Sequence, residues 1–385
     1  MIPQLRFPEF GDNWNPDKLG SVATFSKGKG ISKADISEDG ATECIRYGEL
    51  YTEYSEVINE IVSKTNLDVN ELILSEEDDV IIPASGETQI DIATASCVAK
   101  SGVALGGDLN IIKSAIDGIF LSYYLNNAQK TNIARLSQGI SVVHLYASQL
   151  KTLDINIPIP EEQTKIATFL TAVDKRINLL QKKKTELEQY KKGVMQKLFS
   201  QTIRFKKDDG SDFAEWEEKK LGDVSDIVKG KQLNASELTE EGTYPAINGG
   251  IQPSRYTEDW NTIENTITIS EGGNSCGYVN FIKTKFWSGG HCYSLLNLTN
   301  ETEKEYLYQS LKFNQNKIMR LRVGSGLPNI QKGDINNFKF LSPKKEEQQK
   351  IANFLSSIDN SIEKLGNQID ETQQWKKGLL QKMFV

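Results

Sequence analysis

Residues 161–177, EEQTKIATFLTAVDKRI, return later in the chain as residues 346–362, EEQQKIANFLSSIDNSI. The match continues at an offset of 185 to KKGVMQKLF (191–199) and KKGLLQKMF (376–384). Counted from residues 160 and 345, 19 of 40 positions are identical, far more than shared helical composition gives by chance. Such a repeat indicates a chain built from two similar halves.

Both copies carry apolar residues at alternating spacings of four and three, the heptad pattern of a helix that packs along another helix. The heptad positions run over 166–198 and 351–383, and eight of ten are apolar in each copy. Lys184 and Lys191 interrupt the first series, and Thr372 and Lys376 interrupt the second. Forty helical residues span about 60 Å, so we expect the helices to bury their stripes on each other or on a partner.

Prolines precede both helical segments, at 158, 160 and 343, where they end a strand and permit a helix to begin. Two pairs of acidic residues, Glu161 with Glu162 and Glu346 with Glu347, are then expected in the first turns. Negative charge is favoured there by the helix dipole.

The segments between the helices are also related. Short motifs in the first segment recur in the second: Arg6-Phe7, Trp14, Lys18-Leu19-Gly20 and Lys27-Gly28-Lys29 match Arg204-Phe205, Trp216, Lys220-Leu221-Gly222 and Lys229-Gly230-Lys231. Each segment has short β-branched runs separated by Gly, Asn and Ser, with one helix expected near its end, at 120–136 and 305–321. The predicted fold class is α+β, with globular domains at 1–157 and 201–341 and long helices at 158–200 and 342–385.

Composition limits the function classes. Hydrophobic residues make up 38% of the chain and charged residues 25%, without an apolar run near the roughly 20 residues that span a bilayer. The N-terminus has no signal-peptide pattern, so a cytoplasmic protein is expected. The four cysteines lack the CxxC spacing of zinc knuckles, and we expect no metal site and reduced thiols.

The formal net charge of −7 is unusual for a protein that binds phosphates, because Lys and Arg supply that affinity. Residues 35–79 hold 14 acidic and two basic residues, a local balance of −12 that leaves +5 for the rest of the chain. This acidic segment is interpreted as a solvated outer face, with docking of a basic partner as the alternative.

Over essentially its full length the chain resembles the specificity (S) subunits of type I restriction-modification systems. The resemblance rests on the IPIPEEQTKIATFL and LSPKKEEQQKIANFL boundaries, the KKGxxQKxF endings, the WxxxKLG openings at Trp14 and Trp216, and the QGISVVHL and VGSGLPNI segments. It implies two target-recognition domains separated by two helices that pair as an antiparallel coiled coil with pseudo-twofold symmetry. Each domain would read one half of a split, asymmetric site in double-stranded DNA.

The resemblance also implies partners. The helices would set the spacer between the half-sites and dock two adenine-N6 methyltransferase (M) subunits, and restriction (R) subunits would join for cleavage. S-adenosylmethionine, ATP and Mg²⁺ are then expected on the partners, with no cofactor and no catalytic residue in this chain. Recognition domains vary greatly within the family, so base-reading residues cannot be transferred by position.

Candidate DNA contacts follow from residue chemistry. Lysines after a strand suit phosphates, whereas Arg, Asn, Gln and Ser on Gly-rich loops suit base edges. The candidates in the first domain are Lys27, Lys29, Arg46, Tyr47, Ser85, Gln89, Asn110, Gln138, Ser141 and His144. Those in the second are Lys229, Lys231, Asn248, Arg255, Tyr256, Asn274, Ser275, His291, Arg320, Arg322, Ser325 and Asn329. For each the alternative is a turn former, a solvated side chain or, for the tyrosines, the edge of a core; both histidines have a structural alternative.

Lysines in the late helical turns are candidate partner-binding residues: Lys184, Lys191, Lys192, Lys376 and Lys377. Their alternative is the solvated end of a helix. No NPPY or DPPY run, GxxxxGK[ST] loop or HExxH helix occurs in the sequence, which argues against an enzyme. The acidic residues Asp208, Glu217 and Glu218 with Lys219 superficially resemble the carboxylate cluster of a nuclease, but they are interpreted as a charged linker. A coiled-coil adaptor that binds protein rather than DNA is the competing hypothesis.

Overall fold

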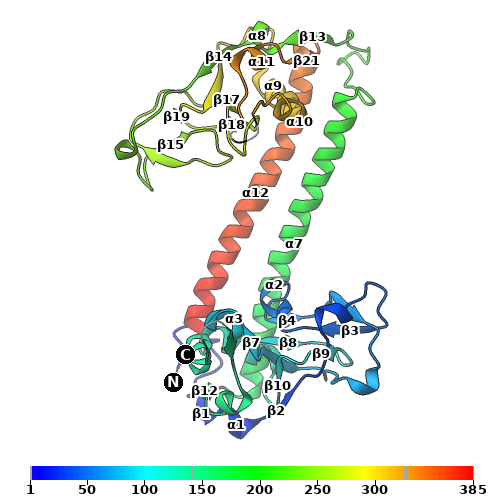
Figure 1. The fold of residues 1–385 in the computed structure, drawn as a ribbon, viewed down its shortest axis with the longest axis vertical. Helices are drawn as coiled ribbons and strands as arrows, with labels where there is room; N and C mark the ends of the chain where they lie inside the picture. The colour runs from blue at the N-terminus through cyan, green and yellow to red at the C-terminus, as the bar shows by residue number, and fades with distance from the viewer. Residues whose placement is uncertain (1, 140–141, 325, 327, 385) are drawn as a thin grey trace. The chain divides into compact units, whose positions relative to one another are not determined.

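The computed structural model describes residues 2–139, 142–324, 326 and 328–384, and the chain divides into two compact units. Unit 1 comprises residues 1–181 and 367–385, and unit 2 comprises residues 182–366. Each unit contains one globular domain together with a part of each long helix (Figure 1). In the sequence, the domain of unit 1, called domain 1, precedes the first long helix, and the domain of unit 2, called domain 2, follows that helix and precedes the second one.

The two long helices are α7 (Pro160–Phe199) and α12 (Lys345–Met383). Every heptad position in both series is buried or half-buried. Inside unit 1, Lys376 Nζ of α12 lies 2.7 Å from Asp174 Oδ1 of α7; inside unit 2, Lys191 Nζ lies 2.6 Å from Asp359 Oδ1. These contacts join α7 to α12 within each unit, and Figure 1 shows the two helices running in opposite directions there, which confirms the predicted antiparallel coiled coil.

These ion pairs explain two of the heptad interruptions. Lys191 and Lys376 are 185 residues apart, as are Asp174 and Asp359. The same lysine–aspartate contact thus forms once in each unit, and both lysine side chains are mostly buried, at 13% and 16% exposure. A charged side chain tolerates such a position because it is paired.

Domain 1 has a five-stranded sheet in the order β2-β10-β6-β8-β4 and a three-stranded sheet in the order β5-β3-β9. Two short ribbons, β1-β12 and β7-β11, complete it. The strands are β1 Asn15–Lys18, β2 Ala23–Lys27, β3 Thr42–Ile45, β4 Val57–Ile58, β5 Ser63–Thr65, β6 Asp79–Pro83, β7 Ser85–Gly86, β8 Ser96–Val98, β9 Ala104–Leu105, β10 Leu109–Ser114, β11 Val143–His144 and β12 Asp154–Ile157. The helices are α1 Leu19–Val22, α2 Glu49–Thr52, α3 Gln89–Ile92, α4 Gly118–Asn127, α5 Lys130–Leu136 and α6 Ala147–Leu150, with 3₁₀ turns η1 Lys33–Asp35 and η2 Val69–Glu71.

Domain 2 repeats this plan with a four-stranded sheet, β14-β20-β17-β18, a three-stranded sheet, β16-β15-β19, and the ribbon β13-β21. Its strands are β13 Glu217–Lys220, β14 Asp226–Lys229, β15 Tyr244–Ile247, β16 Arg255–Thr257, β17 Thr266–Ser270, β18 Val279–Ile282, β19 Trp287–Ser288, β20 Cys292–Leu296 and β21 Lys339–Ser342. Its helices are α8 Leu221–Val224, α9 Lys304–Phe313, α10 Gln315–Met319 and α11 Lys332–Asn336, with the 3₁₀ turn η3 Ala235–Glu237. The parallel pair β3-β9 of domain 1 corresponds to β15-β19 here.

The sequence predicted one helix near the end of each domain, and this prediction was wrong in detail. Domain 1 has α4 and α5, separated by Ala128 and Gln129, and domain 2 has α9 and α10, separated by Asn314. Polar side chains hold both breaks: Gln129 donates to the Tyr124 hydroxyl at 3.0 Å, and Asn314 donates to the Ser310 carbonyl at 2.9 Å. Such amide side chains compete with the helical backbone for hydrogen bonds.

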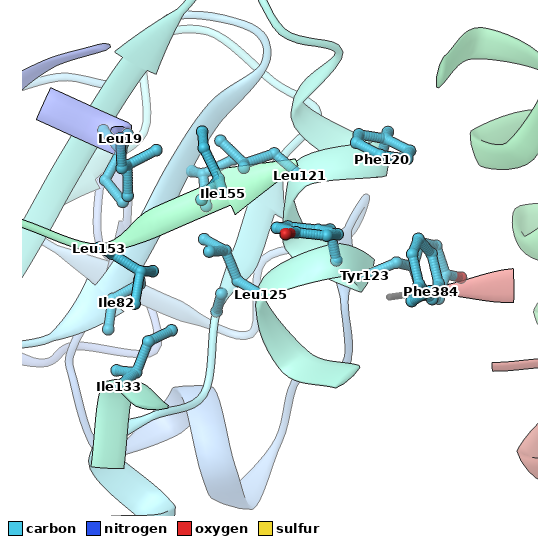
Figure 2. Packing of buried hydrophobic residues seen from close by; sticks show 14 of the residues in the cluster. Leu19, Ile82, Phe120, Leu121, Tyr123, Leu125, Ile133, Leu153, Ile155 and Phe384 are labelled. Atoms are coloured by element: carbon cyan, nitrogen blue, oxygen red, sulfur yellow. The ribbon is translucent and has the colours of Figure 1, made fainter. Parts of the chain in front are cut away.

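The last aromatic residue of each KKGxxQKxF motif closes the core of a domain. Phe384 packs within 6.5 Å, centroid to centroid, of Trp14, Phe120 and Tyr124, and Figure 2 shows it at the edge of this cluster, next to α4. Phe199 makes the equivalent contacts with Trp216 and other rings in unit 2. Each domain is therefore completed by the end of a long helix.

The second glutamate of each EEQ motif anchors its domain to the start of a helix. Glu162 has no exposed side-chain surface and accepts two hydrogen bonds from Arg6, at 2.6 and 2.7 Å, and one from Trp14 Nε1 at 3.4 Å. Glu347 makes the equivalent contacts with Arg204 and Trp216 in unit 2. These glutamates thus serve as buried ion-pair partners, a role that the dipole argument from sequence did not foresee.

Candidate nucleic-acid interface

The Lys27-Gly28-Lys29 segment forms a loop held by the main chain of domain 1. The amide of Gly28 donates to the Leu109 carbonyl at 3.0 Å, and the amide of Lys29 donates to Leu105 at 2.9 Å. A Cβ atom at Gly28 would lie 2.1 Å from the Gly106 carbonyl oxygen, so only glycine fits. Both lysine side chains are exposed on this fixed backbone.

The equivalent segment in domain 2 is built the same way. The amide of Gly230 donates to Cys292 at 2.9 Å, and a Cβ there would lie 2.3 Å from the Gly289 carbonyl oxygen. Lys229 and Lys231 are likewise exposed. The repeated Lys-Gly-Lys motif therefore reflects a shared close approach of two backbone segments, with lysines on either side.

A hairpin lies next to this loop in domain 1. Gln138 and His144 exchange backbone hydrogen bonds of 2.9 and 2.7 Å, and β11 pairs with β7 so that His144 faces Ser85. The Ser85 hydroxyl lies 3.2 Å from His144 Nδ1. A pocket of about 560 Å³ is lined by Lys27, Ser85, Asn110 and His144 among others, so the structure brings these four candidates together.

The corresponding hairpin of domain 2 is closed by Val323 and Asn329, which exchange backbone hydrogen bonds of 2.9 and 3.0 Å. Asn329 also forms a bridge with Gly272, just after β17. Arg322 is exposed directly before this hairpin, as is Arg320 at the end of α10. Two further candidates, Ser141 and Ser325, lie outside the described residues.

Acidic partners modify the charge of the lysine loops. In domain 1, Lys27 Nζ lies 3.6 Å from Asp108 with both side chains exposed, a contact that contributes little in water. In domain 2, Lys229 Nζ lies 2.5 Å from Glu271, whose side chain is only 5% exposed, and His291 Nδ1 lies 3.4 Å from the same carboxylate. Lys229 is therefore partly neutralised, whereas Lys27 is much freer to meet a phosphate.

The Glu271 carboxylate is ionised by its surroundings. Burial raises its pKa, but hydrogen bonds from Lys229 and the Tyr293 hydroxyl outweigh that effect, so the net pKa lies below the usual value for glutamate. In domain 1 the residue after β6 is Ala84, and in domain 2 the equivalent residue after β17 is Glu271. The two domains therefore differ in charge at this matching position.

Arg46 and Tyr47 line a pocket of about 840 Å³ in domain 1. Arg46 directly follows β3 and pairs with Glu49 at 2.7 Å. The equivalent residue after β15 is Asn248. Ile45, just before Arg46, accepts a hydrogen bond from the Gly106 amide at 2.9 Å, and Ile247, just before Asn248, accepts one from the Gly289 amide at the same distance. Asn248 Oδ1 accepts a hydrogen bond from the His291 amide at 3.2 Å.

The other candidates differ in their exposure. Asn110 is buried, and its side-chain amide donates to the Leu145 carbonyl at 2.9 Å, which gives it a structural role. Four further candidates are exposed: Gln89 in α3, Asn274, Tyr256 in β16 and Arg255, which pairs with Glu240 at 3.4 Å. Ser275 is half-buried near Asn274.

Sequence reasoning missed the acidic residues that position the basic ones. Glu49, Asp108 and Glu271 each pair with a candidate DNA-binding side chain. Only the spacing of Arg46 and Glu49, three residues apart, could have signalled such a pair. The other two partners lie 81 and 42 residues away in sequence and depend on sheet topology.

The cysteines, the groups that could bind a metal ion and the helices that could cross a membrane were further points raised by the sequence. All four cysteines are buried and free. No group of His, Cys, Asp and Glu among the described residues could hold a metal ion. Within the same residues, no helix is long and apolar enough to cross a membrane.

Comparisons with known proteins agree on one family. The model of the type I restriction modification DNA specificity domain matches residues 11–189 and 214–372. A putative type I specificity subunit from Mycoplasma genitalium is 33% identical over 173 residues, 44% of this chain and 44% of that protein, so the match spans less than half of that relative's length. The MjaVIII specificity subunit of Methanocaldococcus jannaschii is 25% identical over 406 residues, 98% of this chain and 92% of that protein.

A solved structure shows the same fold. The crystal structure of the S subunit of a type I restriction-modification system from M. genitalium aligns with a TM-score of 0.74 at 20% identity, and the alignment covers 100% of this chain and 99% of that one. The two specificity-domain matches fall one in each half and together cover most of the sequence. This chain therefore belongs to the family of type I restriction-modification specificity subunits.

Proposed function

We propose that each domain reads one half of a bipartite, asymmetric site in double-stranded DNA. The observation that carries this proposal is a shared backbone frame with different side chains on it. Arg46 in domain 1 and Asn248 in domain 2 occupy equivalent positions, as do Ala84 and Glu271. Phosphate contacts position a protein, whereas base contacts specify sequence, so two different faces suit two different half-sites.

The long helices are proposed to set the distance between the half-sites. Each would span about 60 Å for its 40 or 39 residues, comparable with one or two turns of DNA of about 34 Å each. The base pairs between the half-sites would be measured by the helices and left unread.

Two copies of a methyltransferase subunit are the proposed partners of the helices. The support is an aromatic patch that recurs in both units. In unit 1 Phe7 packs edge-on against Phe169 at 5.7 Å, and Phe169 against Trp375 at 6.0 Å, with Trp375 51% exposed. A shallow, mostly apolar hollow of about 400 Å³ adjoins Phe7 and Phe169.

In unit 2 the equivalent residues are Phe205, Phe354 and Tyr190. The first two pack at 5.9 Å, and Tyr190 is 53% exposed. The DNA-reading faces differ between the domains, but the pair of packed phenylalanines and an exposed aromatic residue at the matching helix position recur in both units, as expected if the same protein binds twice. Exposed clusters of aromatic residues are typical of protein interfaces.

A glycine lies one helical turn from each exposed aromatic residue. Gly193 follows Tyr190 by three residues, and Gly378 follows Trp375 by three, so each pair shares a helix face. A Cβ at either glycine would meet nothing within 4 Å. Packing inside the chain therefore does not require glycine at either position. Each of these glycines nevertheless lowers the stability of its helix by about 1 kcal/mol relative to alanine. Close approach of a partner to the helix backbone would explain both.

This patch changes the interpretation of the five candidate partner-binding lysines. Lys191 and Lys376 already pair across the helices, and Lys184 lies 3.9 Å from Glu188. Lys192 and Lys377 are exposed beside the glycines and remain proposed partner contacts.

The glycines offer a test that separates partner binding from folding. Gly193→Ala and Gly378→Ala, singly and together, should raise the thermal stability of the chain and weaken its assembly with the methyltransferase subunit. Gly366→Ala, at another helical glycine where a Cβ also meets nothing within 4 Å, is the matched control and should leave assembly unchanged. Full assembly of the double variant would contradict the proposed surface.

The chain itself is proposed to catalyse nothing. S-adenosylmethionine, ATP and Mg²⁺ would be held by the methyltransferase and restriction subunits, in the cytoplasm. We expect this chain to contribute the choice of site alone.

Co-expression with the neighbouring methyltransferase gene, followed by mapping of methylated adenines, tests the proposal. A split motif should appear, and exchange of one domain for that of a relative should change one half only. A protein adaptor would yield no split motif, and its complex would show no salt-dependent retention of duplex DNA.

A further inference from the structure

Arg46 of domain 1 is held in one orientation before any ligand arrives. Its Nε and Nη2 donate to Glu49 Oε1 at 3.0 and 2.7 Å, and its backbone amide donates to Glu49 Oε2 at 2.9 Å. Both ends of the arginine are therefore tied to the same carboxylate. The guanidinium is planar and always charged, so these bonds fix the direction of its remaining donors.

Glu49 is itself fixed. It opens α2, its side chain is 6% exposed, and its Oε1 accepts a further hydrogen bond from the Ser63 hydroxyl of β5 at 2.6 Å. The carboxylate is thus satisfied by the backbone amide and guanidinium of Arg46 and by the hydroxyl of Ser63. A residue held this firmly acts as a positioning group for Arg46.

The free edge of Arg46 has the geometry of a base reader. Its side chain is 26% exposed and lines the pocket of about 840 Å³. Because Nε and one Nη2 proton are directed to Glu49, the Nη1 protons and the second Nη2 proton remain, and Nη1 meets no acceptor in the described part of the chain. Two parallel donors of one guanidinium match O6 and N7 of guanine in the major groove.

The pocket adjoins the proposed phosphate-binding loop. Asp108 lines it, and the same residue lines the neighbouring pocket that contains Lys27 and His144. Lys33 and Tyr47 lie on the wall of the Arg46 pocket. A duplex whose backbone met Lys27 would therefore pass the mouth of the pocket from which Arg46 is presented.

We propose that Arg46 reads a guanine in the half-site of domain 1 and that Glu49 orients it. This inference rests on the proposed DNA recognition and adds the base. Domain 2 has Asn248 at the equivalent position, so its half-site carries no guanine requirement from this position.

The test uses the full chain with its methyltransferase subunit. The wild-type motif should contain a guanine in one half, and Arg46→Lys should relax that single position while leaving the rest of the motif intact. Lysine keeps the charge and loses the fork, so the preference for guanine should fall about 5- to 150-fold, the equivalent of one bidentate contact. Arg176→Lys, on the exposed face of α7 in the same unit, is the matched control and should change nothing.

Base chemistry gives a second readout. A duplex with 7-deazaguanine at that position lacks the N7 acceptor and should bind the wild-type complex more weakly, whereas the Arg46→Lys complex, without the two parallel donors, should lose less affinity on the same change. Glu49→Gln should relax the same position to a smaller extent, and a thermal melt of each variant reports whether the domain is folded.

Three results would overturn the assignment: a motif without guanine in either half, an unchanged preference in Arg46→Lys, or equal loss on all sequences, which indicates a phosphate contact. If a split motif is found but its guanine does not depend on Arg46, the base assignment alone fails. Absence of any split motif and of salt-dependent DNA binding would instead reject the proposed function.

Discussion

Replacement of Glu162 by glutamine should detach domain 1 from the start of α7. The carboxylate is fully buried, forms two hydrogen bonds of 2.6 and 2.7 Å to Arg6, and accepts a third from Trp14 at 3.4 Å. Glutamine has a similar shape but leaves the Arg6 guanidinium, 11% exposed, without its counter-charge. Removal of one partner of a buried pair costs about 3–5 kcal/mol, a large share of the roughly 5–15 kcal/mol that stabilises a domain.

The assay is hydrogen exchange of the strand ribbons that lead into the helices. In Glu162→Gln the amides of the ribbon β1-β12 should exchange faster, while those of β13-β21 in the other unit stay protected. Glu347→Gln should give the reverse, because it makes the same contacts in unit 2.

Glu161→Gln provides the control. Glu161 precedes Glu162 in the first turn of α7, and its side chain is exposed, so its loss should change stability by less than about 0.5 kcal/mol. Equal stability of Glu161→Gln and Glu162→Gln would refute the anchoring role. A double replacement of Arg6 and Glu162 by methionine should recover much of the lost stability, because no unpaired charge remains.

Three further outcomes are expected. Phe384→Ala should destabilise unit 1 by about 3–5 kcal/mol in urea unfolding, since its ring is 6% exposed among aromatic neighbours; a value below about 1 kcal/mol would contradict its role in the core. Burial, a hydrogen bond with Glu305 and repulsion by that carboxylate raise the pKa of Glu303 to about 7, so its contribution to stability is fully present below about pH 4.5 and is lost as pH rises through 7. Glu303→Gln should accordingly raise the melting temperature more at pH 8 than at pH 5, and an equal shift at both would reject this origin. Lys231→Ala should weaken DNA binding on all sequences and reduce the salt slope by about 0.9, more than Lys229→Ala, whose charge Glu271 already offsets; a change confined to base preference would argue against a phosphate contact.

The arrangement of domains and long helices could be predicted because the sequence of the chain repeats. The 185-residue offset and the heptad spacing located the helices and indicated two related domains, and the structure places α7 at Pro160–Phe199 and α12 at Lys345–Met383. The Lys-Gly-Lys loops were also correctly placed at the ends of strands, β2 and β14. Such features can be predicted from sequence because they depend on residues that are close together in the chain or on a duplicated segment.

Pairwise partners could not be predicted in the same way. Lys191 reads as an interruption of the heptad until Asp359, 168 residues away, is seen beside it. Arg46 was a candidate because of its chemistry, whereas Glu49 and Ser63, which fix its orientation, come together only through α2 and the pairing of β3 with β5.

The proposed spacer role is tested most directly by lengthening both helices together. Insertion of four residues after Gln181 and four after Gly366, positions 185 apart, should keep the antiparallel partners matched and extend each helix by about 6 Å. Mapping of methylated adenines should then show both half-sites unchanged and the gap between them wider by about two base pairs at roughly 3.4 Å each. A motif with the original gap would contradict the claim that the helices measure the distance between the two reading domains.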